Sequence, residues 1–247
     1  MNALRPNTPA SERLAQASAD FEAKLSETQE VLRQASRDHV AIKQASSLGA
    51  EDVVLSHLIA QLDLPITVFV LDTGALHHQT LALLERQQAA ARLKLEIHRP
   101  ETTRVIEWVA RHGQSAIFDS IDLRKDCCRV RKLEPLARAL KGQTAWITGL
   151  RREQSDARAE VPLVDTTEVA RQGRTKYNPL ANWTWGDVWH FIAREHIDYN
   201  PLHDDFFPSI GCAPCTRAIS LGEPYRAGRW WWEDESAKEC GLHVRAA

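Results

Sequence analysis

Three strand–helix units in succession constrain the fold of this chain more than any other feature of its sequence. Each unit combines a short run of apolar and β-branched residues with a longer segment of helical periodicity. The predicted strands lie within 39–45, 65–71 and 93–98, and the predicted helices within 53–62, 76–91 and 102–111. Strands that alternate with helices run parallel, so we expect an α/β fold with a doubly wound, mainly parallel sheet and flanking helices.

The remaining segments extend this sheet and suggest three parts of the chain. A fourth strand is predicted at 144–148 and a short edge strand at 161–164, with a helix over 122–140 between the third and fourth strands. Thr184, with Asp187 three positions later, is typical of a helix N-cap. We expect an N-terminal helical segment, the α/β domain and a mobile C-terminal tail, with bounds of 1–37, 38–220 and 221–247.

Polar loops follow several of the predicted strands. A Ser47-Leu48-Gly49 loop leads into a helix, whose N-terminal N–H groups and dipole attract anions. Asp72-Thr73-Gly74 follows the second strand, and a loop beginning at Gly149 follows the fourth. Because open α/β sheets bind ligands at the carboxyl ends of their strands, these loops are candidate ligand contacts. The first loop is equally compatible with an ordinary strand–helix turn, because it lacks both the Rossmann glycine pattern and the lysine of a Walker loop.

Composition favours a cytoplasmic protein over a membrane or nucleic-acid-binding protein. The 247 residues are 43% hydrophobic, but no apolar run is long enough to span a bilayer, and residues 1–9 lack the apolar core of a signal peptide. The net charge of −2 disfavours nucleic acid as a partner. Basic residues instead cluster locally around 124–132, 151–158 and 217–229. Such clusters either recognise a phosphate or sulfate group or form solvated surfaces.

The cysteines indicate a metal centre. Cys212 and Cys215 form a Cys-x-x-Cys pair, and Cys127 and Cys128 are adjacent. A Cys-x-x-Cys turn brings two thiolates to one metal or cluster, and neighbouring thiolates reach separate corners of an iron–sulfur cubane more easily than one zinc ion. Two alternatives stay open, a redox disulfide between Cys212 and Cys215 or chemically inert buried thiols at Cys127 and Cys128. Cys240, near the C-terminus, is either a reactive thiol or an incidental one.

Several motifs together resemble those of the assimilatory sulfonucleotide reductases, a family within the PP-loop adenine-nucleotide superfamily. They span roughly residues 40–243 in the order that the family shows. The matching segments are Ser47–Asp52, Leu71–His77, Lys125–Lys132, Thr148–Arg152 with Arg158, Pro179–Trp189, Gly211–Cys215, Arg226–Trp232 and Glu239–His243. Two separate cysteine motifs and the Glu-Cys-Gly-Leu-His tail make the resemblance specific.

The resemblance implies a cofactor and a substrate. One branch of the family reduces 3′-phosphoadenylyl sulfate (PAPS) and commonly lacks the cluster cysteines. The other reduces adenylyl sulfate (APS) and carries Cys-Cys and Cys-x-x-Cys around a [4Fe-4S] cluster, and this chain is similar to that second branch. The ligands so implied are Cys127, Cys128, Cys212 and Cys215.

The resemblance also implies roles for individual residues. Cys240 would attack the sulfate sulfur of APS, leaving an S-sulfocysteine that reduced thioredoxin resolves to sulfite. Lys132, close to Cys128 along a helix, would act as a second catalytic residue by coupling the field of the cluster to the sulfate. The substrate-binding residues implied are Ser47, Gly49, Asp52, Leu71, Thr73, Gly149, Arg158, Arg226, Arg229 and His243. The family also suggests a homo-oligomer.

Three other functions remain open at this point. A PAPS reductase that holds a cluster would share every motif named above. A PP-loop sulfurtransferase would bind ATP, but the loop at Ser47 lacks the two consecutive glycines of ATP-pyrophosphatase relatives. A zinc-stabilised scaffold without enzymatic activity would hold zinc and would not need Cys240.

Overall fold

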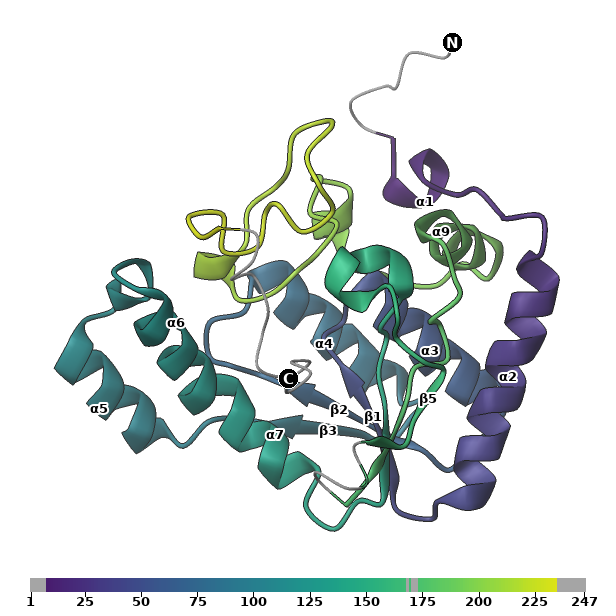
Figure 1. The fold of residues 1–247 in the computed structure, drawn as a ribbon, viewed down its shortest axis with the longest axis horizontal. Coiled ribbons are helices and arrows are strands. Elements are labelled where there is room, and N and C mark those ends of the chain that lie inside the picture. Colours follow the sequence, from purple (N-terminus) through teal and green to yellow (C-terminus); the bar gives the residue numbers. More distant parts are fainter. Residues whose placement is uncertain (1–7, 168, 170–172, 235–247) are drawn as a thin grey trace.

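A single six-stranded sheet organises the molecule (Figure 1). This computed structural model describes residues 8–167, 169 and 173–234. The strand order is β3-β2-β1-β4-β6-β5, and every pairing is parallel except that of β5 with β6. The strands are β1 (Ile42–Ser46), β2 (Thr67–Leu71), β3 (Leu95–His98), β4 (Ala145–Ile147), β5 (Val164–Asp165) and β6 (Thr175–Tyr177). The doubly wound α/β fold expected from the sequence is confirmed.

Alternating residues of the strands bury opposite faces of the sheet. Val70 and Ile147 belong to the main core, which also takes in the buried faces of α2, α3, α4 and α9. Their neighbours Phe69 and Trp146 pack on the other face against the end of α7. Figure 1 accordingly shows α5, α6 and α7 on one side of the sheet and α3 and α4 on the other. Both faces of the parallel sheet are therefore covered by helices.

The helices begin and end close to the predicted positions. Thr184 accepts a hydrogen bond from the N–H of Asp187 at the start of α9, as its capping pattern predicted. The helices are α1 (Ala10–Arg13), α2 (Phe21–Asp38), α3 (Ala50–Gln61), α4 (His78–Ala90), α5 (Thr102–His112), α6 (Ile121–Cys128), α7 (Glu134–Ala139) and α9 (Trp185–Arg194).

The helix predicted over 122–140 is interrupted by a different helical form. Residues Arg129–Leu133 form a π-helical turn between α6 and α7. A π turn closes its hydrogen bonds between residues five apart and admits one extra residue relative to an α-helix. The expected closeness of Lys132 to Cys128 stays a prediction.

Strand β6 has no counterpart among the predicted strands. Lys176 stands in the middle of this strand, yet it is only 5% exposed, and its Nζ lies 5.0 Å from the centre of the Trp146 ring. A cation above an aromatic face is stabilised by the ring quadrupole, which lets a lysine occupy a strand position that apolar patterning would exclude. The edge strand predicted at 161–164 corresponds to β5, which begins at its last residue.

Both ends of the described chain pack onto the domain. Helix α2 contributes Phe21, Leu25 and Leu32 to the main core. Near the other end, Trp230 is buried in a second cluster with Cys215. The proposed division at residues 37 and 220 stays a prediction, and residues 235–247 lie outside the described part. Within the described residues, no helix combines the length and the apolar character needed to cross a bilayer.

Candidate functional site

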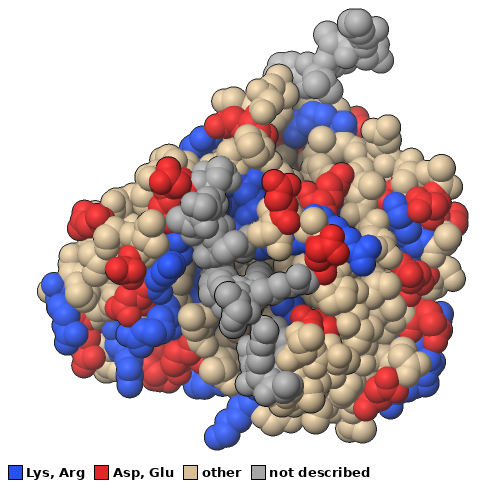
Figure 2. All heavy atoms as spheres, in the orientation of Figure 1, with Lys and Arg blue, Asp and Glu red and all other residues tan. Residues whose placement is uncertain are grey.

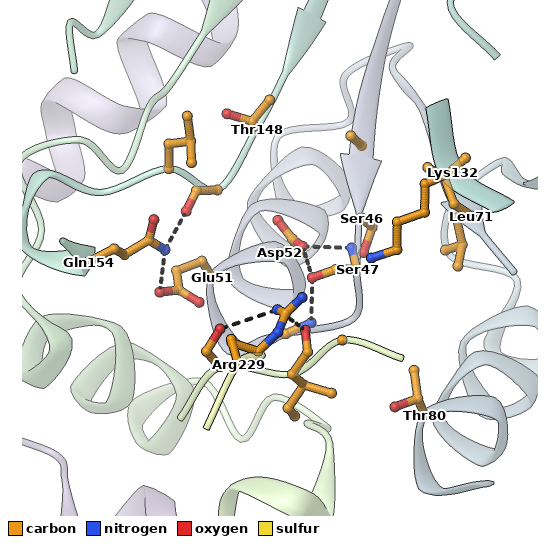
Figure 3. Close-up of a pocket in the computed structure, with 18 of the residues that line it drawn as sticks. Ser46, Ser47, Glu51, Asp52, Leu71, Thr80, Lys132, Thr148, Gln154 and Arg229 are labelled. Atoms are coloured by element: carbon orange, nitrogen blue, oxygen red, sulfur yellow. Dashed lines mark hydrogen bonds between the residues drawn. The ribbon is translucent and has the colours of Figure 1, made fainter. Parts of the chain in front are cut away.

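A pocket opens at the point where the sheet topology changes direction. The chain builds β1, β2 and β3 towards one edge and β4 and β6 towards the other, so the change occurs between β1 and β4. Open parallel sheets bind ligands outside the carboxyl ends of the strands at such a point. The pocket is lined there by Ser46 and Ser47 after β1, Leu71 at the end of β2, and Thr148 and Gly149 after β4 (Figure 3).

The loop between β1 and α3 forms one wall of the pocket. Leu48 adopts a left-handed conformation with φ of 62°. Asp52, in the first turn of α3, accepts hydrogen bonds from the N–H and the hydroxyl of Ser47 at 2.6 and 2.7 Å (Figure 3). These bonds fold the loop back over the helix N-terminus, the end of a helix that favours anions. Burial is the largest influence on Asp52 and raises its pKa to about 6 despite the bonds from Ser47.

Gly149 lets β4 approach α3 closely. A Cβ at this position would lie 2.6 Å from Oδ1 of Asp52 and 2.8 Å from Cβ of Glu51. No side chain larger than hydrogen fits without displacing the first turn of α3. The glycine therefore closes the pocket floor between the two halves of the sheet.

Four cationic side chains line the pocket. Lys132 comes from the π-helical turn, Arg158 from a short 3₁₀ helix (Asp156–Arg158), and Arg226 and Arg229 from the C-terminal part. Arg229 is 7% exposed, and its guanidinium donates to the carbonyl of Ile210 at 3.1 Å. Its Nε is buried and has no hydrogen-bond partner within the described residues. Convergent guanidinium and ammonium groups of this kind suit phosphate or sulfate oxygens.

Glu51, a buried carboxylate, also lines the pocket and forms an ion pair with Arg151. Its Oε1 accepts hydrogen bonds from Nε of Arg151 at 2.9 Å, from Nε2 of Gln154 at 2.9 Å and from the hydroxyl of Tyr225 at 3.2 Å. Burial raises the pKa of Glu51, but the charge of Arg151 and these hydrogen bonds outweigh it, so the pKa lies below its usual value. Glu51 is therefore ionised near neutral pH.

Most of the substrate-binding residues predicted from the motifs meet in this pocket. Thr73 does not line it; its hydroxyl lies 3.2 Å from Sγ of Cys212. Cys240 and His243 lie outside the described residues. The residues that do line it are Ser47, Gly49, Asp52, Leu71, Lys132, Gly149, Arg158, Arg226 and Arg229. The prediction missed Glu51, Gln154 and Tyr225, of which only Glu51 stands in a matching motif.

Three of the four cysteines predicted to hold a cluster lie in an apolar cluster next to the pocket. Cys127, Cys212 and Cys215 pack there with Val130 and Trp230. Cys212 and Cys215 are free thiols. Burial, followed by the charge of Cys212, raises the pKa of the Cys215 thiol to about 12. Within the described ranges, no group of three or more His, Cys, Asp or Glu side chains converges on a single ion.

Backbone contacts join the cysteine loop to the anion pocket. Thr216, beside Cys215, forms a β-bridge with Arg229, and the N–H of Trp230 donates to the carbonyl of Cys215 at 3.2 Å. Gly211, beside Cys212, lies so close to the Arg229 guanidinium that a Cβ would overlap it. The segments that carry the thiols therefore also fix the position of Arg229.

The distribution of surface charge places no large field of one sign over this side of the molecule. Figure 2 shows acidic and basic side chains interspersed over the described part of this face.

Comparison with known proteins identifies the family. The model of the phosphoadenosine phosphosulfate reductase domain matches residues 41–218. The chain belongs to this family. It is 51% identical over 216 residues to an adenosine 5′-phosphosulfate reductase of Allochromatium vinosum, a match that covers 87% of this chain and 84% of that protein. It is 47% identical over 225 residues to the enzyme of the same name from Burkholderia cepacia, with 91% and 89% covered.

Solved structures place this reductase-family chain in the same fold. The crystal structure of phosphoadenylyl-sulfate reductase from Candida auris, a phosphate complex, has a TM-score of 0.66 and 29% identity, and the match covers 83% of this chain and 98% of that one. Candida glabrata FMN adenylyltransferase is similar in fold alone, with a TM-score of 0.56 and 14% identity over 97% of this chain and 86% of that chain. The family resemblance drawn from the motifs is confirmed.

Proposed function

We propose that this protein reduces adenylyl sulfate to sulfite and AMP, using reduced thioredoxin as the electron donor, in the assimilation of sulfate. The observation that carries the proposal is the meeting of two features that the motifs predicted separately. A pocket with four cationic residues lies at the carboxyl edge of the sheet, and a group of cysteines adjoins it through Arg229. The relatives named adenosine 5′-phosphosulfate reductase support the choice of substrate.

The proposed reaction has two steps. The thiolate of Cys240 attacks the sulfate sulfur, forming an S–S bond while the bond to the phosphate oxygen breaks and AMP leaves. In the second step, a thiolate of reduced thioredoxin attacks Sγ of Cys240 and sulfite leaves with the electron pair. The second thioredoxin thiolate then displaces the Cys240 thiolate from the mixed disulfide, so thioredoxin ends as a disulfide. Lys132, Arg158, Arg226 and Arg229 would offset the negative charge of the sulfate and the departing phosphate.

We propose Cys127, Cys128, Cys212 and Cys215 as the ligands of a [4Fe-4S] cluster. Soft thiol donors in an apolar setting suit iron–sulfur ligation. When bound, the cluster would supply a local electrostatic field rather than the two electrons, which come from thioredoxin.

The cysteine chemistry also suggests where the protein works. Thiol ligands and a thiolate nucleophile need a reducing compartment, so we place the protein in the cytoplasm. We carry over a homo-oligomer from the family resemblance.

The proposal is tested by measuring sulfite release from adenylyl sulfate and from PAPS side by side, with reduced thioredoxin and anaerobically purified protein. We expect strong preference for adenylyl sulfate. Preference for PAPS would keep the fold and the nucleophile but replace the substrate, an outcome to which the likeness to a phosphoadenylyl-sulfate reductase gives weight. Turnover of neither substrate would overturn the proposal.

The roles of Cys240 and of the cluster are tested separately. Cys240→Ser should abolish sulfite release while leaving iron and acid-labile sulfide unchanged. Cys212→Ser should lower the iron content. Zinc without acid-labile sulfide in the native protein would contradict the cluster.

A further inference from the structure

Glu51 is a carboxylate in a pocket built for anions, and binding of a sulfate or phosphate group does not explain its presence. It lines the pocket together with four cationic side chains. A carboxylate so close to a bound anion would weaken binding through like-charge repulsion. Its hydrogen bonds with other protein groups indicate a structural role in the pocket.

Oxygen Oε1 of Glu51 is a shared acceptor for two different walls of the pocket. Gln154, in the 3₁₀ turn after β4, donates to it at 2.9 Å, and the Tyr225 hydroxyl in the C-terminal part donates to it at 3.2 Å. Nε of Arg151 also donates to this oxygen, at 2.9 Å. The Arg151 side chain is 1% exposed, and its positive charge compensates the negative charge of Glu51. Figure 3 shows the Glu51 and Gln154 side chains meeting beneath the pocket.

Each wall carries one of the cationic residues that line the pocket. The Gln154 amide is oriented by its contacts, because Nε2 also donates to the carbonyl of Gly149 at 3.2 Å while Oε1 accepts from Nη1 of Arg158 at 2.6 Å. Reversal of this amide would turn its NH₂ towards the Arg158 guanidinium. On the other wall, Tyr225 directly precedes Arg226, and its ring packs edge-on against Trp185 with centroids 5.1 Å apart.

We propose that Glu51 is a positioning residue, whose Oε1 holds Gln154 and Tyr225 so that Arg158 and Arg226 face the same bound anion from opposite walls. This inference rests on the proposed function, since it concerns how the pocket grips the sulfate-bearing substrate. Glu51 itself need not touch that substrate. Its Oε1 atom joins two segments that are far apart in sequence.

The test uses the two donors rather than Glu51. Removing the carboxylate would leave the buried Arg151 charge uncompensated and could unfold the protein. Tyr225→Phe keeps the ring and loses only the hydroxyl, and Gln154→Met keeps the approximate length and loses the amide. Tyr199→Phe is the matched control, because the Tyr199 hydroxyl also donates to a carboxylate, that of Asp204, at 2.9 Å, and neither residue lines the pocket.

The measurement is calorimetric binding of adenylyl sulfate and of adenosine, with Cys240→Ser in every protein so that no turnover occurs. We expect Tyr225→Phe and Gln154→Met each to weaken adenylyl sulfate binding about tenfold. Tyr225→Phe loses one hydrogen bond to a charged group, and Gln154→Met loses its bond to Glu51 together with those to Gly149 and Arg158. Adenosine, which lacks the anion, should bind all variants alike. Tyr199→Phe should leave both affinities unchanged.

The double variant distinguishes one shared acceptor from two independent contacts. If Glu51 links the walls, the effects should fall short of multiplying, and the double variant should weaken binding by about 30-fold rather than about 100-fold. Unchanged affinities in the single variants, full multiplication, or an equal loss for adenosine would each overturn the inference. Failure of the parent Cys240→Ser protein to bind adenylyl sulfate would instead overturn the proposed function, and the inference with it.

Discussion

Substitution of Gly149 by alanine tests the close approach of β4 to α3. The added methyl group would lie 2.6 Å from Oδ1 of Asp52, whereas an unstrained contact between such atoms is about 1 Å longer. Overpacking of this kind costs about 1–3 kcal/mol, from which about 0.4–1 kcal/mol is subtracted because alanine also restricts the unfolded chain. The net loss of about 1–2 kcal/mol corresponds to a fall in Tm of roughly 2–8 °C for a chain of this size.

The same displacement should also impair the pocket. The first turn of α3 must move to admit the methyl group, and that turn carries the Asp52 carboxylate that holds Ser47. We therefore expect both a lower Tm by calorimetry and weaker adenylyl sulfate binding. Gly142→Ala is the control, because Gly142 has φ of +76° and nothing within 4 Å of its Cβ position, so it tests backbone strain alone.

Two results would refute this reasoning. One is a Gly149→Ala protein with unchanged Tm and affinity, which would mean that the interface of β4 and α3 yields without cost. The other is an equal loss of affinity in Gly142→Ala, which would attribute the effect to general destabilisation rather than to the pocket.

Three further predictions concern charged groups. The pKa of Asp52 is raised to about 6 in the folded protein, so between pH 4 and pH 6 the native state binds more protons than the unfolded state. The free energy of unfolding should therefore fall by up to about 3 kcal/mol as the pH rises from 4 to 6. Urea titration of Asp52→Asn at several pH values should show that this dependence on pH is lost. Glu233→Gln removes the carboxylate that lies 2.6 Å from the Arg124 guanidinium, which is 1% exposed, and should lower the free energy of unfolding by about 3–5 kcal/mol. Glu134→Gln, in an exposed ion pair, should lower it by less than about 1 kcal/mol. Equal shifts of the urea midpoint in the two variants would contradict this prediction. Lys132→Ala should lose most sulfite production while retaining iron, and unchanged turnover would exclude Lys132 from the reaction.

The parts of the fold that could be predicted are those where local pattern and burial agree. The apolar run that ends at Leu71 gives the interior strand β2, and the helix predicted over 53–62 is α3, which begins slightly earlier, at Ala50. These elements bury apolar side chains in the core, so the spacing of hydrophobic residues along the sequence predicts which side chains are buried. The family motifs extended this reading to Lys132 and Arg229, which are far apart in sequence and meet in the pocket.

The parts that escaped prediction depend on pairwise contacts between distant residues. Lys176 interrupts the apolar pattern of β6, but the ring of Trp146 on β4 stabilises its ammonium group. The network around Glu51 draws on a tyrosine 174 positions away, and nothing near Tyr225 in the sequence marks its hydroxyl for that partner. Such interactions are visible only once the chain has folded.

The π-helical turn at Arg129–Leu133 makes the number of residues between the cysteine pair and Lys132 more important than their identity. Deletion of one residue here would let α6 and α7 merge into one regular helix with almost the same phase, because the π turn already accommodates one extra residue. Insertion of a further residue would instead rotate everything before the turn by about 100° about the helix axis. Cys127 and Cys128 would then point away from the loop that carries Cys212, although every side chain at both sites would be intact. An insertion is thus more damaging in this segment than most substitutions, because it changes the phase between two sites rather than the chemistry of either.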